Sequence, residues 1–145
     1  MTPARRPPLV RYAEAMSGIL VASAVVRAVP FRRVMRWTRL PHRRRAADEQ
    51  AVAEIRRAVQ AAARRVPWRA LCFEQGLAAA WMLRRRGFAA DVHYGAATIE
   101  GELKAHVWVR SGDKDVVGCE NSDEYALLAR FPDDSPVSDG SHGRC

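Results

Sequence analysis

Residues 66–87 read VPWRALCFEQGLAAAWMLRRRG, and this stretch decides the fold. After Pro67, which stops any preceding helix, apolar residues recur at helical spacing and predict a helix over residues 72–86. Three arginines fill its last turn, where the helix dipole is negative, and Gly87 follows that turn. Cys72 stands at the first position of this helix, where free N–H groups and the positive end of the dipole favour a thiolate.

The flanking residues predict further helices before this one and strands after it. Apolar residues spaced by three and four predict helices upstream, and short alternating runs separated by turn residues predict strands downstream. Helices are expected at 9–29, 31–40, 48–66 and 72–86, and strands at 90–98, 105–110 and 115–120. Helices followed by a small antiparallel sheet are typical of the α+β class.

The 145 residues are enough for one domain with a substantial core. The net charge is +8, and residues 1–47 hold eleven of the 24 basic residues against a single acid, Glu14. We therefore expect a basic N-terminal helical segment over 1–47, the core over 48–132 and a flexible tail over 133–145. A basic segment can meet nucleic acid, an anionic membrane or an acidic peptide.

Composition and motifs exclude several classes of protein. Cys72, Cys119 and Cys145 are too few for a disulfide framework and favour a reducing compartment, the cytoplasm. No apolar run reaches about 18 residues, so we expect no membrane span. A zinc site built from Cys72, His93, His106 and Cys119 has no closely spaced ligand pair, and phosphate-loop, dinucleotide and HExxH motifs are missing. We therefore expect no metal and no cofactor.

His106 is the candidate base. In the expected strand AHVWVR (105–110), alternation sets His106 and Trp108 on the face opposite Val107. A histidine on the polar face of a strand can take a proton from a thiol that faces it. Taken alone, Cys72 is more often a small buried hydrophobe, and His106 a solvated or hydrogen-bonded histidine.

A third group should orient the imidazole. The following strand offers Asp115 and Glu120, and the turn before it offers Asp113. Each of these is also an ordinary solvated acid at a strand end, and periodicity leaves the three alternatives open.

Three blocks of the chain, taken in order, resemble the transglutaminase-like cysteine peptidases of lasso-peptide biosynthesis, the B proteins that remove the leader from the precursor. The blocks are PWRALCF (67–73), MLRRRG (82–87) and AHVWVR (105–110), and the resemblance covers residues 10–132. It implies a transglutaminase-like or papain-like fold with the nucleophile at a helix N-terminus. It also implies that Cys72 is the nucleophile and His106 the general base.

The chain departs from the family pattern at the third member of the site. The family usually has an Asp on the strand after the histidine, and Gly118 or Cys119 falls nearest that place. We take Glu120 as the first candidate for this acid and Asp115 as the second. Trp68 and Trp108 are expected to form walls of a small substrate pocket.

The resemblance also implies partners. Some family members are fused to a winged-helix domain that binds the leader, the RiPP recognition element, and residues 1–47 leave no room for one. The chain therefore resembles the stand-alone peptidase half, which would act on a precursor peptide presented by a separate leader-binding protein. An ATP-dependent, asparagine-synthetase-like cyclase would use the product, and no nucleic acid takes part. Two alternatives remain: an acyl transferase on the same fold, or a non-catalytic basic module that binds nucleic acid or anionic surfaces.

Overall fold

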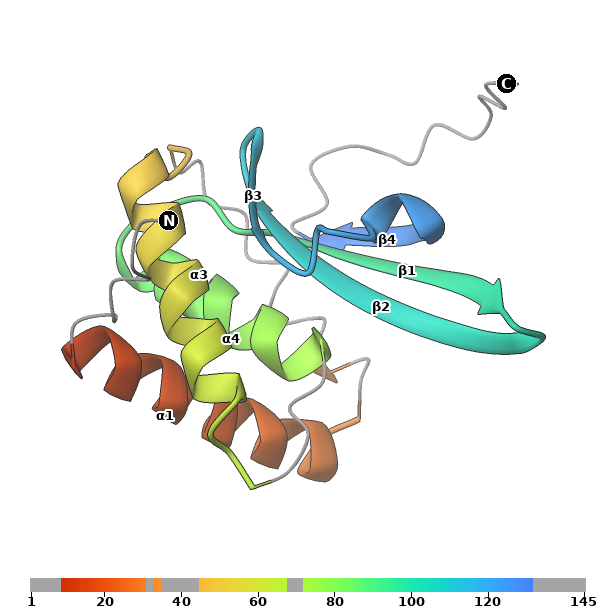
Figure 1. Cartoon of the computed structure of the whole chain (residues 1–145), viewed down its shortest axis with the longest axis horizontal. Coiled ribbons are helices and arrows are strands. Elements are labelled where there is room, and N and C mark those ends of the chain that lie inside the picture. Colours follow the sequence, from red (N-terminus) through yellow and green to blue (C-terminus); the bar gives the residue numbers. More distant parts are fainter. Residues whose placement is uncertain (1–8, 31–32, 35–44, 68–71, 132–145) are drawn as a thin grey trace, which may run out of the picture.

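A computed structural model describes residues 9–30, 33–34, 45–67 and 72–131 of the chain. Within these residues, three helices of full length are followed by four strands (Figure 1). The helices are α1 (Leu9–Ala28), α3 (Glu49–Ala63) and α4 (Cys72–Arg85), and the strands are β1 (Asp91–Ile99), β2 (Glu102–Ser111), β3 (Lys114–Val117) and β4 (Ala126–Phe131). A short 3-10 helix, η1 (Ser122–Glu124), precedes β4. The α+β class is confirmed.

The strands form one antiparallel sheet in the order β3-β2-β1-β4. The expected meander of three strands is confirmed, and it pairs His93 with Trp108 and Gly95 with His106 across β1 and β2. The edge strand β4 was not predicted; it pairs with β1 on the side away from β2. The segment between β3 and β4 therefore connects the two edges of the sheet.

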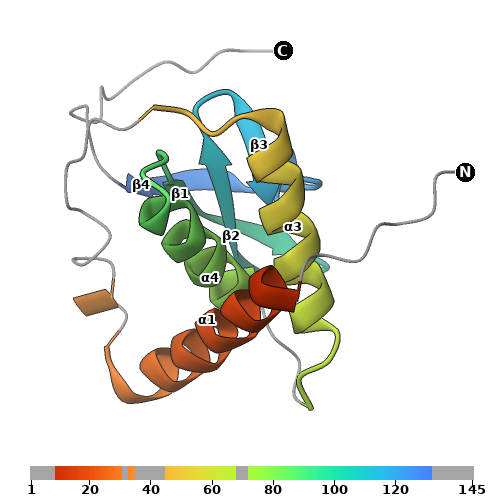
Figure 2. The same ribbon diagram turned by 90° about the vertical axis from the view of Figure 1, so that its left-hand side faces the viewer.

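All three helices lie on one side of the sheet (Figure 1). Both α3 and α4 contact the sheet, and α1 packs against these two helices (Figure 2). The side chain of Asp48 accepts a hydrogen bond from the Ala51 N–H at 2.8 Å, which caps α3 at its predicted start. The largest fully buried apolar side chains are Ile19, Ile55, Val59, Met82, Leu83, Val92, Val109 and Val116.

Helix α1 shares this core. Ala15 and Ile19 are completely buried in the same cluster as Ile55 and Leu83. The expected boundary at residue 47 stays a prediction, and α1, on its N-terminal side, packs into the same core as α3 and α4. The proposed tail, 133–145, and most of the expected helix 31–40 lie outside the described residues, although Arg33 and Val34 are helical.

The expectation about membrane spans needs a correction. With 20 residues, α1 is long and apolar enough to cross a membrane, so the argument from unbroken apolar runs is wrong for this helix. A core helix or a signal sequence passes the same test, and α1 contributes Ala15 and Ile19 to the core. The absence of a membrane span stays a prediction.

Candidate active site

Cys72 is the first residue of α4, and its thiol is free and partly buried. The first backbone N–H groups of a helix have no partner within the helix, and together with the helix dipole they favour negative charge at this end. The 14 residues of α4 are anchored in the core through Met82 and Leu83. The thiol is therefore held at a rigid helix terminus.

Cys72 and His106 line the same pocket, which has a volume of about 300 Å³. The helix terminus lies on one side of it and β2 on the other, so the two residues predicted to act together are brought to one cavity. The remaining lining residues are Val26, Val29, Val34, Phe73, Tyr94, Ala105 and Val107. Within the described part of the chain no hydrogen bond joins the Cys72 thiol to the His106 ring, so proton transfer needs either a closer approach of the two side chains or one bridging water.

The imidazole of His106 is held by three groups. Its Nε2 lies 2.7 Å from the carbonyl oxygen of Gly118. Its ring stacks on Tyr125, with centroids 4.8 Å apart, and on Trp108, with centroids 5.9 Å apart. The ring thus packs against two aromatic side chains, and its Nε2 lies against a backbone acceptor.

Among the described residues, neither acid proposed for the third member of the site is hydrogen-bonded to His106. Asp115 forms an ion pair with Arg110, with Nε and Oδ1 2.9 Å apart, and lines a separate pocket beside α3. Glu120 is exposed, two residues beyond Gly118. The hydrogen-bond partner of His106 Nε2 is the Gly118 carbonyl and not either of these carboxylates.

The two tryptophans proposed as pocket walls have different outcomes. Trp68 lies outside the described residues. Trp108 is buried, and it stacks on both His93 and His106 rather than lining the pocket that holds Cys72. Trp108 therefore packs against the His106 ring and is not a wall of the Cys72 pocket.

Tyr125 and the carbonyl of Gly118 were missed as site groups. Tyr125 follows η1, and its aromatic ring at the end of the polar stretch CENSDEY was the only sequence signal for it. A backbone carbonyl leaves no signal in the side-chain pattern. A glycine directly after a β-strand can only indicate an unusual backbone conformation.

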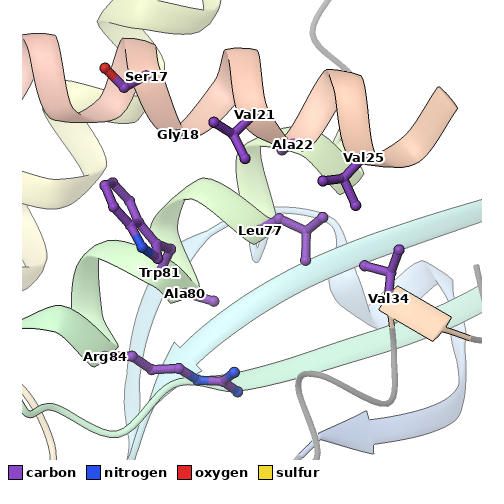
Figure 3. Close-up of a pocket in the computed structure, with 10 residues that line it drawn as sticks. All are labelled: Ser17, Gly18, Val21, Ala22, Val25, Val34, Leu77, Ala80, Trp81 and Arg84. Atoms are coloured by element: carbon purple, nitrogen blue, oxygen red, sulfur yellow. The ribbon is translucent and has the colours of Figure 1, made fainter. Parts of the chain in front are cut away.

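A second pocket, of about 350 Å³, lies between α1 and α4 (Figure 3). Val21 from α1 and Leu77 and Trp81 from α4 face the same space (Figure 3). Val34 lines both pockets, and Phe73 in the first lies one helical turn before Leu77 in the second. The two pockets are therefore neighbours along α4.

Cys119 is chemically unlike Cys72. Its thiol donates to the carbonyl oxygens of Val109 and Val117 at 3.4 and 3.5 Å. Burial first, and then the negative charge of Asp115, raise the pKa of the Cys119 thiol to about 11. Across the described residues no three His, Cys, Asp or Glu side chains gather as a metal site, and the expected absence of a metal stays a prediction.

The family follows from comparison with known proteins. The model of the transglutaminase-like superfamily matches residues 16–130, which include most of α1, the Cys72 helix and all of the sheet except its last residue, Phe131. The chain belongs to the transglutaminase-like superfamily. No curated protein and no solved structure matches it. Members of the superfamily are typically cysteine peptidases or acyltransferases, and both reactions use a cysteine nucleophile.

Proposed function

We propose that this chain is the leader peptidase of a lasso-peptide system, a cysteine peptidase that releases the core peptide from its precursor. The observation that supports the proposal is the shared pocket of Cys72 and His106 in a member of the transglutaminase-like superfamily. The three sequence blocks described above support the narrower assignment to lasso-peptide maturation.

The reaction uses the pair in two steps. The Cys72 sulfur attacks the carbonyl carbon of the last leader residue as His106 takes the thiol proton, and the N–H groups at the start of α4 stabilise the oxyanion. His106 then gives the proton to the leaving amine, so the C–N bond breaks and the core peptide leaves with a free amino terminus. Water hydrolyses the thioester, which frees the leader and restores the thiol.

The second pocket suits a peptide substrate. Its lining is largely apolar, and it adjoins the Cys72 pocket through Val34. About nine residues separate Cys72 from Trp81, which is roughly 13 Å along the helix, or the length of about four extended residues. An apolar residue of the substrate about four positions from the cleaved bond would occupy the groove of Val21, Leu77 and Trp81.

The proposed partners follow from the same assignment. A separate winged-helix protein would hold the leader, and an ATP-dependent cyclase of the asparagine-synthetase type would join the new amino terminus to a side-chain carboxyl. All of them would act in the cytoplasm. A small precursor gene, a winged-helix gene and a cyclase gene beside this one would support the assignment.

Cleavage of the precursor tests the proposal. We expect the chain, together with the precursor and the leader-binding protein encoded beside it, to yield two fragments in a mass spectrum. Cys72→Ala abolishes cleavage, and the matched variant Cys119→Ser keeps it because the serine hydroxyl can donate to the same carbonyls. Undiminished cleavage by Cys72→Ala would rule the peptidase out.

Acyl transfer is the second candidate, because the superfamily contains acyltransferases and the same pair serves both reactions. The products separate the two reactions. Hydrolysis gives two fragments, whereas transfer to an amine gives a joined product.

A further inference from the structure

The segment that follows β3 brings a backbone carbonyl to His106. Gly118 has a φ of +73°, a left-handed conformation that favours glycine. A Cβ atom built there would lie 2.6 Å from the carbonyl oxygen of Val107 and 3.3 Å from the Cα of Trp108. The chain therefore crosses β2 at a distance that only glycine permits, and this crossing brings the Gly118 carbonyl within 2.7 Å of His106 Nε2.

The residue after Gly118 holds this crossing in place. The Cys119 thiol donates to the carbonyls of Val109 and Val117, and the Ser122 hydroxyl donates to the Cys119 carbonyl at 3.0 Å. The Gly118 carbonyl is thus fixed by contacts to two strands. It is not a group on a free loop.

A carbonyl oxygen can only accept a hydrogen bond, so Nε2 of His106 must carry the proton that it shares with Gly118. In the neutral ring the other nitrogen, Nδ1, then has a free lone pair. Nδ1 is therefore the atom that can receive the thiol proton. A carboxylate in a Cys–His–acid site achieves the same result by accepting from the distal nitrogen.

We propose that the Gly118 carbonyl is the positioning group of His106, in the role that an acid has in related cysteine sites, and that neither Glu120 nor Asp115 performs it. The stacked rings of Tyr125 and Trp108 fix the plane of the imidazole, and the carbonyl fixes its tautomer. This inference rests on the proposed Cys72–His106 pair for its catalytic meaning. The tautomer itself does not depend on that pair.

The first experiment measures the tautomer. Nitrogen-15 spectra of the histidine side chains in the full chain, with His106 assigned by the loss of its signals in His106→Gln, report which ring nitrogen is protonated. We expect a neutral His106 with the proton on Nε2. A neutral His106 with its proton on Nδ1 would overturn the proposal.

The second experiment measures how fast iodoacetamide alkylates Cys72, located by peptide mapping, because only the thiolate reacts. Glu120→Gln and Asp115→Asn should stay within about twofold of wild type. Gly118→Ala should slow the reaction at least about tenfold, since general-base assistance is worth roughly 10²–10⁴-fold. A tenfold slower alkylation of Cys72 in Glu120→Gln or Asp115→Asn would show that this acid is the positioning group of His106, and would overturn the proposal.

Two features keep the outcomes separable. If Gly118→Ala fails to fold, the two acid variants and the wild-type spectrum still decide between the carbonyl and a carboxylate. If Cys72 of the wild type reacts no faster than Cys119, the proposed catalytic pair fails, whereas the spectrum still reports the partner of His106 Nε2.

Discussion

The imidazole of His93 lies parallel to the indole of Trp108, with ring centroids 5.5 Å apart and the two planes 7° apart. The two residues face each other across β1 and β2, and Trp108 also stacks on His106. His93 Nδ1 is buried and has no hydrogen-bond partner among the described residues. The ring that supports the proposed base therefore packs against a histidine whose charged form is disfavoured by burial.

This packing predicts that acid weakens the fold. Burial first, and then the positive charge of Arg130, lower the pKa of His93 below its ordinary value of 6.5. Below about pH 6.5 the unfolded chain therefore binds more protons than the folded one, and this contribution to stability falls as the pH drops through the folded-state pKa. Well above pH 6.5 and well below the folded-state pKa, His93 contributes no pH dependence, because the folded and unfolded chains then bind the same number of protons.

Urea denaturation at about pH 7.5 and about pH 5 measures the effect through the shift of the midpoint. His93→Phe keeps a ring for Trp108 and cannot be protonated, so its midpoint should change less between the two conditions than that of wild type. Equal changes in the two proteins would refute the prediction.

Gly95 should tolerate no side chain. It pairs with His106 in the sheet, and a Cβ there would lie 2.9 Å from the Trp108 ring and 2.8 Å from the Ala126 carbonyl oxygen. We expect Gly95→Ala to lower the free energy of unfolding by about 1–3 kcal/mol, as overpacking does. Thr98→Ala, exposed on the same strand, should stay within about 0.5 kcal/mol of wild type. A stable Gly95→Ala protein would show that Trp108 can move without cost.

The cysteines should differ in reactivity. Because the pKa of Cys119 is raised to about 11, its thiol is almost entirely protonated near neutral pH. We expect iodoacetamide to modify Cys72 well before Cys119 in the folded protein, and denaturation in urea to remove the difference. Peptide mapping by mass spectrometry after short exposures measures both sites. Equal labelling in the folded protein would contradict the assigned environments.

The groove between α1 and α4 should affect substrate binding and leave the reactivity of Cys72 unchanged. Val21 is 62% exposed and lines the groove, so Val21→Glu adds a charge there without burying it in the core. We expect a several-fold higher KM for precursor cleavage and an unchanged rate of Cys72 alkylation.

The control for the groove is Leu103→Glu, because Leu103 is 79% exposed near the β1–β2 turn and lines none of the pockets described here. It should leave both measurements unchanged. An unchanged KM in Val21→Glu would remove the groove from the substrate site.

The sequence predicted the elements whose patterns are local. The spacing of Val52, Ile55 and Val59 indicated α3, and Pro67 with the apolar run after Cys72 indicated α4. The strand β4 was missed because residues 126–131 do not alternate. Leu127 and Leu128 are adjacent and both more than half exposed, and the strand depends on distant pairing with β1.

The side-chain pattern also predicted the candidate catalytic pair, but it did not predict the backbone group that contacts His106. Cys72 and His106 could be selected because a cysteine at a helix start and a histidine on a strand are visible in the side-chain pattern. The partner of His106 Nε2 could not be predicted, because every residue has a backbone carbonyl. Only the left-handed conformation of Gly118 brings its carbonyl to the imidazole.

Alkylation of Cys72 in wild type and in His106→Gln, at equal pH near neutrality, tests the central claim most directly. The account predicts that removing the imidazole slows the reaction at least about tenfold, with the slow labelling of Cys119 unchanged as an internal reference. Rates for Cys72 that agree within about twofold would show that the thiol and the imidazole lining one pocket do not act as a pair.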